Sequence, residues 1–453
     1  MKKTLIISII FLLSISCLYS KDYHIKGKIN SLRAMKIYIQ DFYGKENLFY
    51  DSAKVSFSGG FEFILNDNNK PGLYRLRTGE NFFLDFIFNR TDVSFETDYS
   101  APVSAMKFIN SPNNDSYYYY LRMLANFRKK IELLLPLIEK YPQNDGFYPK
   151  IIKQVESLKN EFVGYIDSVQ KSKTDNFVKK LILCDRSYVL QPAFTKIFDK
   201  ESLKQSFFDN IDFTNTTILY SETYANIIIS YLSLFNDPSL GRTKQIAVFK
   251  QACDELLKRT AHSEVLYQFT VEFLINGFKQ IHYNEVVDYV VLNNQVDNNC
   301  VNSAKRSELN TQIAQLKQTV IGSAAPAVVF TNFENEKLPL YSIKSDLTLI
   351  VFWASWCPHC KIDIPELASL AKANSDKLKV VMVSLDRNVD DARKAIEAYD
   401  AGFINVIETS VWDSPITNNF NVFATPTYFL LNSNMRIIDK PFNINDLKEV
   451  LNR

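Results

Sequence analysis

The sequence predicts a multidomain protein with an N-terminal antiparallel β-sandwich, an α-helical middle region and a C-terminal α/β domain. Short alternating segments with turn residues come first, helical periodicity dominates the middle, and apolar strands alternate with helices at the end. The expected divisions are a signal peptide, a β-domain, a helical region and an α/β domain, over residues 1–20, 21–110, 111–320 and 321–453.

The first residues have the order of charge and apolarity that is typical of an export signal. Lys2 and Lys3 precede an apolar run over residues 5–13, which is too short to span a membrane permanently. Cleavage after Ser20 is one interpretation, and a lipoprotein box with acylation of Cys17 is the other. Export would place the chain in the periplasm or cell envelope, where conditions are oxidising.

Composition argues against several classes of partner. The chain has 453 residues, of which 46% are hydrophobic, with 34 Phe and 24 Tyr, so it is not a disordered protein. The net charge of +2 gives no reason to expect a nucleic acid as partner. The four His residues leave little material for a His-rich metal site, and neither a metal nor a cofactor is expected. Membrane contact is expected only if Cys17 is lipidated.

The β-region shows the alternation of half-buried strands. Apolar and polar residues alternate from Asp22 to Ile29, and Gly59-Gly60 separates two further alternating runs. Short strands with turn residues between them predict an antiparallel sandwich or small barrel. This region contains no catalytic constellation.

The middle region shows the periodicity of amphipathic helices. Ile151, Val155, Leu158, Phe162 and Ile166 fall at three- and four-residue steps, which predicts one helix face. Further helices are expected over residues 175–190, 220–235, 244–259, 263–279 and 303–319.

Three cysteines belong to this helical region. Cys184 and Cys253 occur in apolar helical segments and are interpreted as buried small hydrophobic residues. Cys300 lies in a polar loop, so a Cys253–Cys300 disulfide fits an oxidising compartment, but the sequence alone does not establish that pair.

The last third of the chain alternates strand and helix. Residues 347–353 form a continuous apolar run, as expected of a strand buried on both faces, and residues 378–385 form a second. The order predicts a mixed central sheet flanked by helices. Other strands are expected over residues 427–431 and 436–439, and helices from near Cys357 and over residues 389–400 and 445–452.

A Cys-x-x-Cys motif follows the first of these buried strands and begins a helix. The helix N-terminus presents unpaired N–H groups and a positive dipole end, which stabilise a thiolate. Pro358 is tolerated in the first turn, where its missing N–H has no helical partner. Cys357, nearer the helix start and more exposed, is the expected attacking thiol, and Cys360 is the expected buried resolving thiol.

The alternatives to redox chemistry are a structural disulfide and half of a zinc site. Zinc would need further ligands, and the sequence has no second Cys-x-x-Cys and no His near this one apart from His359. Redox function is therefore the prediction. His359 is expected to tune the thiolate, with a solvated residue as the alternative, and Trp356 to pack at the rim of the site.

Residues 351–360 resemble the thioredoxin superfamily signature, and Thr425-Pro426 resembles the cis-proline loop that faces the cysteines in that family. The similarity covers residues 320–453 and is closest to the exported TlpA-like and ResA-like branch. The resemblance implies a thioredoxin fold and thiol–disulfide oxidoreductase activity at Cys357 and Cys360. It also implies exported protein or peptide substrates and an envelope electron donor or acceptor.

The resemblance assigns further roles to the site. A cis bond at Pro426 would expose the Thr425 main chain to a substrate peptide, beside Trp356 and Pro358; an ordinary proline at a strand start is the alternative. The Pro358-His359 pair is similar to that of DsbA-like oxidants, whereas the TlpA-like branch usually reduces, so the net direction stays open.

Two positions depart from the family pattern. Thioredoxin has a buried Asp on the strand before the motif, where this chain has Val351. The TlpA-like branch has a Glu three residues after the second cysteine, where this chain has the shorter Asp363. Asp363 is either a proton relay for Cys360 or an exposed, dispensable acid near the helix start.

Two other functions remain as alternatives. One is a binding protein in which the β-domain and the helical region carry the main role. The other is a thiol peroxidase, but residues 350–357 lack the Pro-x-x-x-Thr-x-x-Cys context of the peroxiredoxins.

Overall fold

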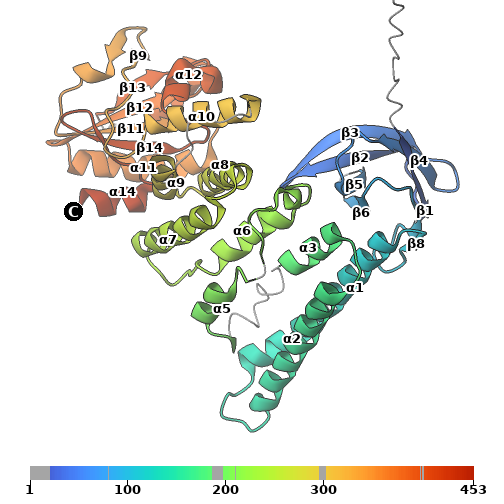
Figure 1. Ribbon diagram of the computed structural model, residues 1–453. Helices are drawn as coiled ribbons and strands as arrows, with labels where there is room; N and C mark the ends of the chain where they lie inside the picture. Colours follow the sequence, from blue (N-terminus) through green and yellow to red (C-terminus); the bar gives the residue numbers. More distant parts are fainter. Residues whose placement is uncertain are drawn as a thin grey trace, which may run out of the picture. The chain divides into compact units, whose positions relative to one another are not determined.

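The computed structural model describes residues 21–79, 81–185, 197–209, 211–294, 303–397, 399 and 402–452. The chain divides into two compact units, one reaching to Leu234 and one starting at Phe235 (Figure 1). The predicted signal peptide, Cys17 and Cys300 lie outside the described residues. The divisions at residues 110/111 and 320/321 remain predictions.

The first unit begins with two four-stranded sheets, in the orders β4-β1-β7-β8 and β3-β2-β5-β6. Ile25 of one sheet and Ile39 and Phe86 of the other are fully buried in one shared hydrophobic core. The strands are β1 (Asp22–Asn30), β2 (Lys36–Tyr43), β3 (Glu46–Lys54), β4 (Gly60–Asn66), β5 (Gly72–Thr78), β6 (Phe82–Phe88), β7 (Val93–Asp98) and β8 (Lys107–Ile109).

One strand pair differs from the predicted antiparallel arrangement. β1 and β7 run parallel, with Ile25 opposite Val93. A parallel pair needs a long crossover, and here the five strands between β1 and β7 provide it. The antiparallel prediction is therefore wrong at this pair, and the sandwich remains a prediction.

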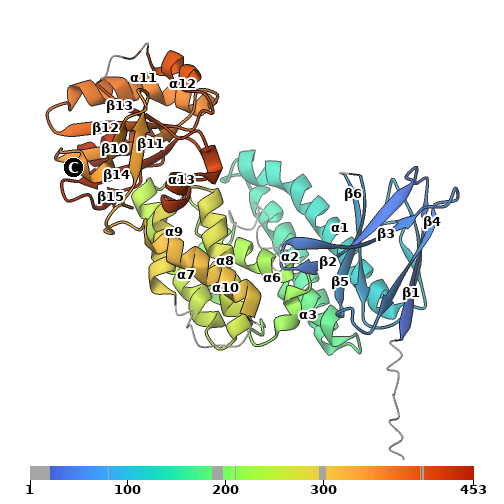
Figure 2. The ribbon, with the colours of Figure 1, turned by 90° about the horizontal axis from the view of Figure 1, so that it is seen from above.

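Helices complete the first unit, and α1 and α2 lie side by side as a helical hairpin (Figures 1 and 2). The predicted face of α2 is confirmed, since Ile151, Val155 and Phe162 are buried. The helices are α1 (Pro112–Lys140), α2 (Tyr148–Lys171), α3 (Asn176–Cys184), α5 (Lys200–Ser206), the 3-10 turn η1 (Thr216–Leu219) and α6 (Thr223–Ser233).

The second unit begins with a bundle of four labelled helices (Figure 2). Three of them match predicted segments, whereas α9 has no predicted counterpart. Its β-branched residues, such as Val286 and Val290, have low helix propensity and are held helical by burial. The helices are α7 (Arg242–Thr260), α8 (Glu264–Gln280), α9 (Asn284–Asn293) and α10 (Ser303–Lys317).

The predicted mixed sheet is confirmed, with strand order β10-β9-β13-β12-β11-β14-β15. β11 lies between a parallel neighbour, β12, and an antiparallel one, β14. The strands are β9 (Val329–Asn332), β10 (Lys337–Pro339), β11 (Leu347–Trp353), β12 (Leu378–Ser384), β13 (Ile404–Ile407), β14 (Thr427–Asn432) and β15 (Ile437–Asp439). The helical elements are η2 (Leu340–Ser342), α11 (Pro358–Ala373), α12 (Val389–Ile396), η3 (Val411–Asp413), α13 (Pro415–Asn419) and α14 (Ile444–Leu451).

A buried ion pair ties α9 to the segment that follows β15. Lys440 Nζ lies 2.6 Å from Asp288 Oδ1, and the two side chains are only 9% and 8% exposed. The N–H of Ile321 donates to the other Asp288 oxygen at 3.1 Å. Burial raises the pKa of Asp288 although Lys440 acts in the opposite direction. Desolvation therefore outweighs the attraction between the two charges.

Removing one partner of this ion pair should lower the unfolding free energy of the second unit more than removing both. Lys440→Met should lower the unfolding free energy of the second unit by about 3 kcal/mol, because the Asp288 charge stays buried and unpaired. Adding Asp288→Asn should restore most of that loss. All three Trp residues of the chain lie after Phe235, so tryptophan fluorescence in a urea titration follows this unit. Equal losses in the single and double variants would contradict the account.

Candidate active site

Cys357 lies between the end of the central strand β11 and the start of helix α11. β11 ends at Trp353, and α11 begins at Pro358, which makes Cys357 the N-cap residue. The backbone N–H of Cys360 donates to Cys357 Sγ at 3.2 Å. The predicted helix start at the motif is therefore confirmed. A sulfur in this position receives an N–H at the positive end of the helix dipole, an arrangement that favours its anion.

The two thiols differ in their surroundings. Cys357 is 3% exposed and Cys360 is 0% exposed, and both belong to the core around the central sheet. Burial, followed by the contact with Cys357, raises the pKa of the Cys360 thiol well above its usual range. At neutral pH Cys360 therefore holds its proton until a base removes it.

The proline loop lies against Cys357, although it is distant in sequence. β14 starts at Thr427 and pairs with β11, with Phe352 opposite Thr427. This register brings the loop before β14 next to the residues that follow β11. The Thr425–Pro426 bond is cis. The Thr425 carbonyl oxygen accepts a hydrogen bond from Cys357 Sγ at 3.3 Å, so the structure brings these predicted site residues together.

Asp363 is held by a tyrosine that the sequence did not single out. The Tyr428 hydroxyl donates to Asp363 Oδ2 at 2.7 Å. Tyr428 lies opposite Val351 in the β11–β14 register, and opposing residues of an antiparallel pair project from the same face. Burial, and then the Asp363 carboxylate, raise the pKa of Tyr428 far above its usual range, so the hydroxyl stays a donor.

This pair bears on the departure from thioredoxin at Val351. The strand before the motif carries no acid, and the carboxylate comes instead from α11, about one turn beyond Cys360. Asp363 is half-buried, and thus not the fully exposed acid of the second interpretation. An anionic Cys360 or Cys357 would raise the pKa of Tyr428 further, so the Tyr428–Asp363 pair lies within electrostatic range of the dithiol.

A second missed residue, Asp386, anchors the loop before Trp356. It is 2% exposed, and it accepts hydrogen bonds from the N–H and the hydroxyl of Ser355 at 3.0 and 2.6 Å. Ser384 Oγ donates to the same carboxylate at 2.8 Å. The carboxyl ends of the parallel strands β11 and β12 meet at one edge of the sheet. A Ser-x-Asp at the end of β12 was therefore a usable signal.

The remaining predicted residues form an exposed rim. Trp356 is 54% exposed, and Pro358 and His359 are exposed on the first turn of α11. Phe423, two residues before Thr425, is 46% exposed on the proline loop. An apolar surface of this kind beside a buried thiol is suited to contact with a polypeptide.

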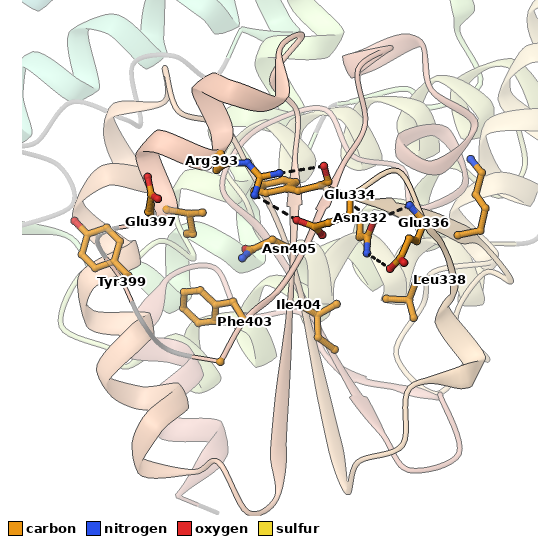
Figure 3. Close-up of a pocket in the computed structure, with 14 residues that line it drawn as sticks. Asn332, Glu334, Glu336, Leu338, Arg393, Glu397, Tyr399, Phe403, Ile404 and Asn405 are labelled. Atoms are coloured by element: carbon orange, nitrogen blue, oxygen red, sulfur yellow. Dashed lines mark hydrogen bonds and ion pairs between the residues drawn. The ribbon is translucent and has the colours of Figure 1, made fainter.

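A hollow of about 560 Å³ lies on the C-terminal domain, away from the Cys-x-x-Cys motif (Figure 3). Arg393 and Glu334 point toward one another there, with Nη1 and Oε1 3.3 Å apart. Its lining includes Ile404 at the amino end of β13, whereas the motif follows the carboxyl end of β11, which runs in the same direction. No motif or proline-loop residue lines this hollow, so size alone does not mark the site.

The described ranges contain neither a metal-binding cluster nor a helix able to span a membrane. No group of three or more His, Cys, Asp or Glu side chains in these ranges is placed to hold a metal ion. None of the helices in the same ranges combines the length and apolarity that a membrane crossing requires.

Known proteins match part of this chain, and the match of the family model lies in the C-terminal region. A thioredoxin-like family model matches residues 345–437. The thioredoxin-like protein YneN of Bacillus subtilis is 31% identical over 113 residues, which cover 24% of this chain and 64% of that protein. The sporulation thiol-disulfide oxidoreductase A of Bacillus subtilis is 32% identical over 114 residues, 24% of this chain and 67% of that protein.

A further relative is more distant in sequence but matched over a longer stretch. The thiol-disulfide oxidoreductase ResA of Bacillus cereus is 24% identical over 128 residues, which cover 28% of this chain and 72% of that protein. The chain thus spans slightly less than two thirds of YneN and somewhat more of the other two relatives.

Proposed function

Because the C-terminal region of this chain belongs to the TlpA/ResA-like thiol–disulfide oxidoreductases, we propose that the protein exchanges disulfides of exported proteins or peptides at Cys357 and Cys360. The observation that carries the proposal is the position of Cys357 Sγ at the N-cap of α11, with the Cys360 N–H directed at it. A thiolate there is the nucleophile that disulfide exchange requires.

The first step is attack by the Cys357 thiolate on one sulfur of a substrate disulfide. A bond forms between that sulfur and Cys357 Sγ, the substrate S–S bond breaks, and the other substrate sulfur leaves as a thiolate that takes a proton from water. The Thr425 carbonyl, 3.3 Å from Sγ, lies where a substrate strand would run beside the proline loop.

The second step resolves the mixed disulfide. Cys360 gives its proton to a base and attacks Cys357 Sγ, so the Cys357–Cys360 disulfide forms and the substrate sulfur leaves. Asp363, oriented by Tyr428, is the base that we propose. Two electrons have then passed from the dithiol to the substrate, and a dithiol donor of the envelope returns them; an acceptor would drive the reverse direction.

We also propose that the chain is exported to the periplasm or cell envelope. The charge and apolar order of residues 2–13 supports this. Acylation at Cys17 would add a membrane anchor.

The proposal is tested by turnover of a protein disulfide. The purified full-length chain should accelerate insulin reduction by dithiothreitol, measured as B-chain precipitation. No acceleration over dithiothreitol alone would contradict it. Hydrogen peroxide offered as an alternative oxidant should be consumed far more slowly than insulin, since the peroxidatic context is missing.

The redox potential should depend on His359. A protonated or hydrogen-bonding imidazole beside Cys357 favours its anion and so stabilises the reduced form. We expect a potential above the value of about −270 mV for thioredoxin, and a fall of about 30 mV or more in His359→Pro. The substitution is compatible with the first turn, where the N–H has no helical partner.

Equilibration with glutathione, followed by quantification of the dithiol and disulfide forms, measures both potentials. A wild-type potential at or below that of thioredoxin, unmoved by His359→Pro, would show that His359 does not tune the site.

A further inference from the structure

A lysine of the helical bundle reaches the proline loop beside the dithiol. Lys279, in the last turn of α8, holds its Nζ 4.0 Å from the ring centroid of Phe423. Phe423 precedes by two residues the threonine whose carbonyl contacts Cys357. The bundle therefore places a positive charge against the exposed ring of Phe423 on the proline loop.

Lys279 differs from its neighbour Lys440 in ion pairing. Lys279, Lys440 and Pro426 line one small cavity of about 50 Å³. Lys440 is neutralised by Asp288 at 2.6 Å, whereas no carboxylate among the described residues forms an ion pair with Lys279. Lys279 is half-buried, and this burial lowers its pKa.

A partly desolvated ammonium group without a counter-ion is unfavourable, and an aromatic face compensates only in part. An alternative explanation for the position of Lys279 is that its charge complements the helix dipole at the C-terminal end of α8. The dipole explains why a cation lies in this turn, but it does not explain why the Lys279 ammonium lies over the exposed ring of Phe423. A carboxylate arriving with the substrate would complete the charge pair.

We propose that Lys279 and Phe423 form a subsite for an acidic side chain of the substrate, close in sequence to the cysteine that Cys357 attacks. The inference rests on the proposed function and adds a substrate class, disulfides flanked by Asp or Glu. Phe423 offers apolar contact to the stem of the acidic side chain, and Lys279 offers the charge.

The test uses cyclic disulfide peptides that differ in one residue. In each pair, Glu or the isosteric Gln occupies the same position, and the position is moved from three residues before to three residues after the cysteine. The quantity measured is the ratio of kcat/KM for the Glu peptide to that for the Gln peptide, with the full-length chain. We expect a ratio of about ten at the preferred position in low salt, falling as salt is added.

Variants of the full-length chain locate the preference. Lys279→Gln should bring the ratio close to one, Lys279→Glu should invert it, and Lys279→Arg should keep it. Lys258→Gln, which removes an exposed lysine from the last turn of α7, serves as the matched control and should keep the wild-type ratio.

The outcomes separate this inference from the proposed function. If the wild type reduces both members of every pair equally well, or if Lys279→Gln keeps the preference, the acidic subsite is wrong and the oxidoreductase proposal stands. If the wild type reduces none of the peptides and does not reduce insulin, the oxidoreductase proposal fails and the subsite fails with it.

Discussion

Cys357→Ser should abolish catalysed disulfide reduction, leaving only the background rate of dithiothreitol itself. The reason is that the thiolate at the N-cap of α11 is the atom that attacks the substrate, and a serine hydroxyl is not ionised at neutral pH. Cys360→Ser should also stop turnover, but at a later stage. In the Cys360→Ser variant, attack by Cys357 on the substrate should proceed, and the mixed disulfide should then persist.

Insulin reduction and single-turnover kinetics measure these two effects. Cys253→Ala is the control, because it removes a buried cysteine of the helical bundle that takes no part in the proposed exchange. The assignment of roles would be contradicted if Cys357→Ser kept the first attack and Cys360→Ser lost it.

Asp363→Asn should slow resolution of the mixed disulfide by about a hundredfold and change the initial attack far less. General-base groups contribute about 10²–10⁴-fold, and the raised pKa of Cys360 makes its proton the one that needs a base. The deficit should shrink at high pH, because hydroxide can then remove that proton. Tyr428→Phe, which keeps the carboxylate but loses the 2.7 Å hydrogen bond, should slow resolution by about tenfold.

Acid-quenched mixing with mass spectrometry follows formation and decay of the mixed disulfide separately. Glu366→Gln is a matched control. Glu366 is an exposed acid on α11, the helix that carries Asp363, and it pairs with Lys448. Equal resolution rates for the wild type and Asp363→Asn across the pH range would show that Asp363 is dispensable.

The core of the C-terminal domain could be predicted because its signals are local. The apolar run that became β11 and the Cys-x-x-Cys that follows it are contiguous in sequence, and the helix start at Cys357 is where the motif indicates it. The short strands β9, β10 and β13 have three or four residues each, too few for periodicity to show.

The partners of the site residues could not be predicted, because they come from register and not from sequence proximity. Tyr428 meets Asp363 only because β14 lies antiparallel to β11, and Asp386 meets Ser355 only because β12 lies parallel to it. The parallel pair of β1 and β7 was missed for a similar reason. Alternation shows which side chains are buried but not which strands pair.

We expect Cys357 to be the residue that forms the covalent bond with the substrate. The most direct measurement incubates the Cys360→Ser chain with a disulfide peptide, isolates the covalent adduct and maps the linked cysteine by peptide mass spectrometry. We expect one stable adduct at Cys357 and none in the Cys357→Ser chain. An adduct at Cys184 or Cys253, or equal trapping by both single variants, would contradict it.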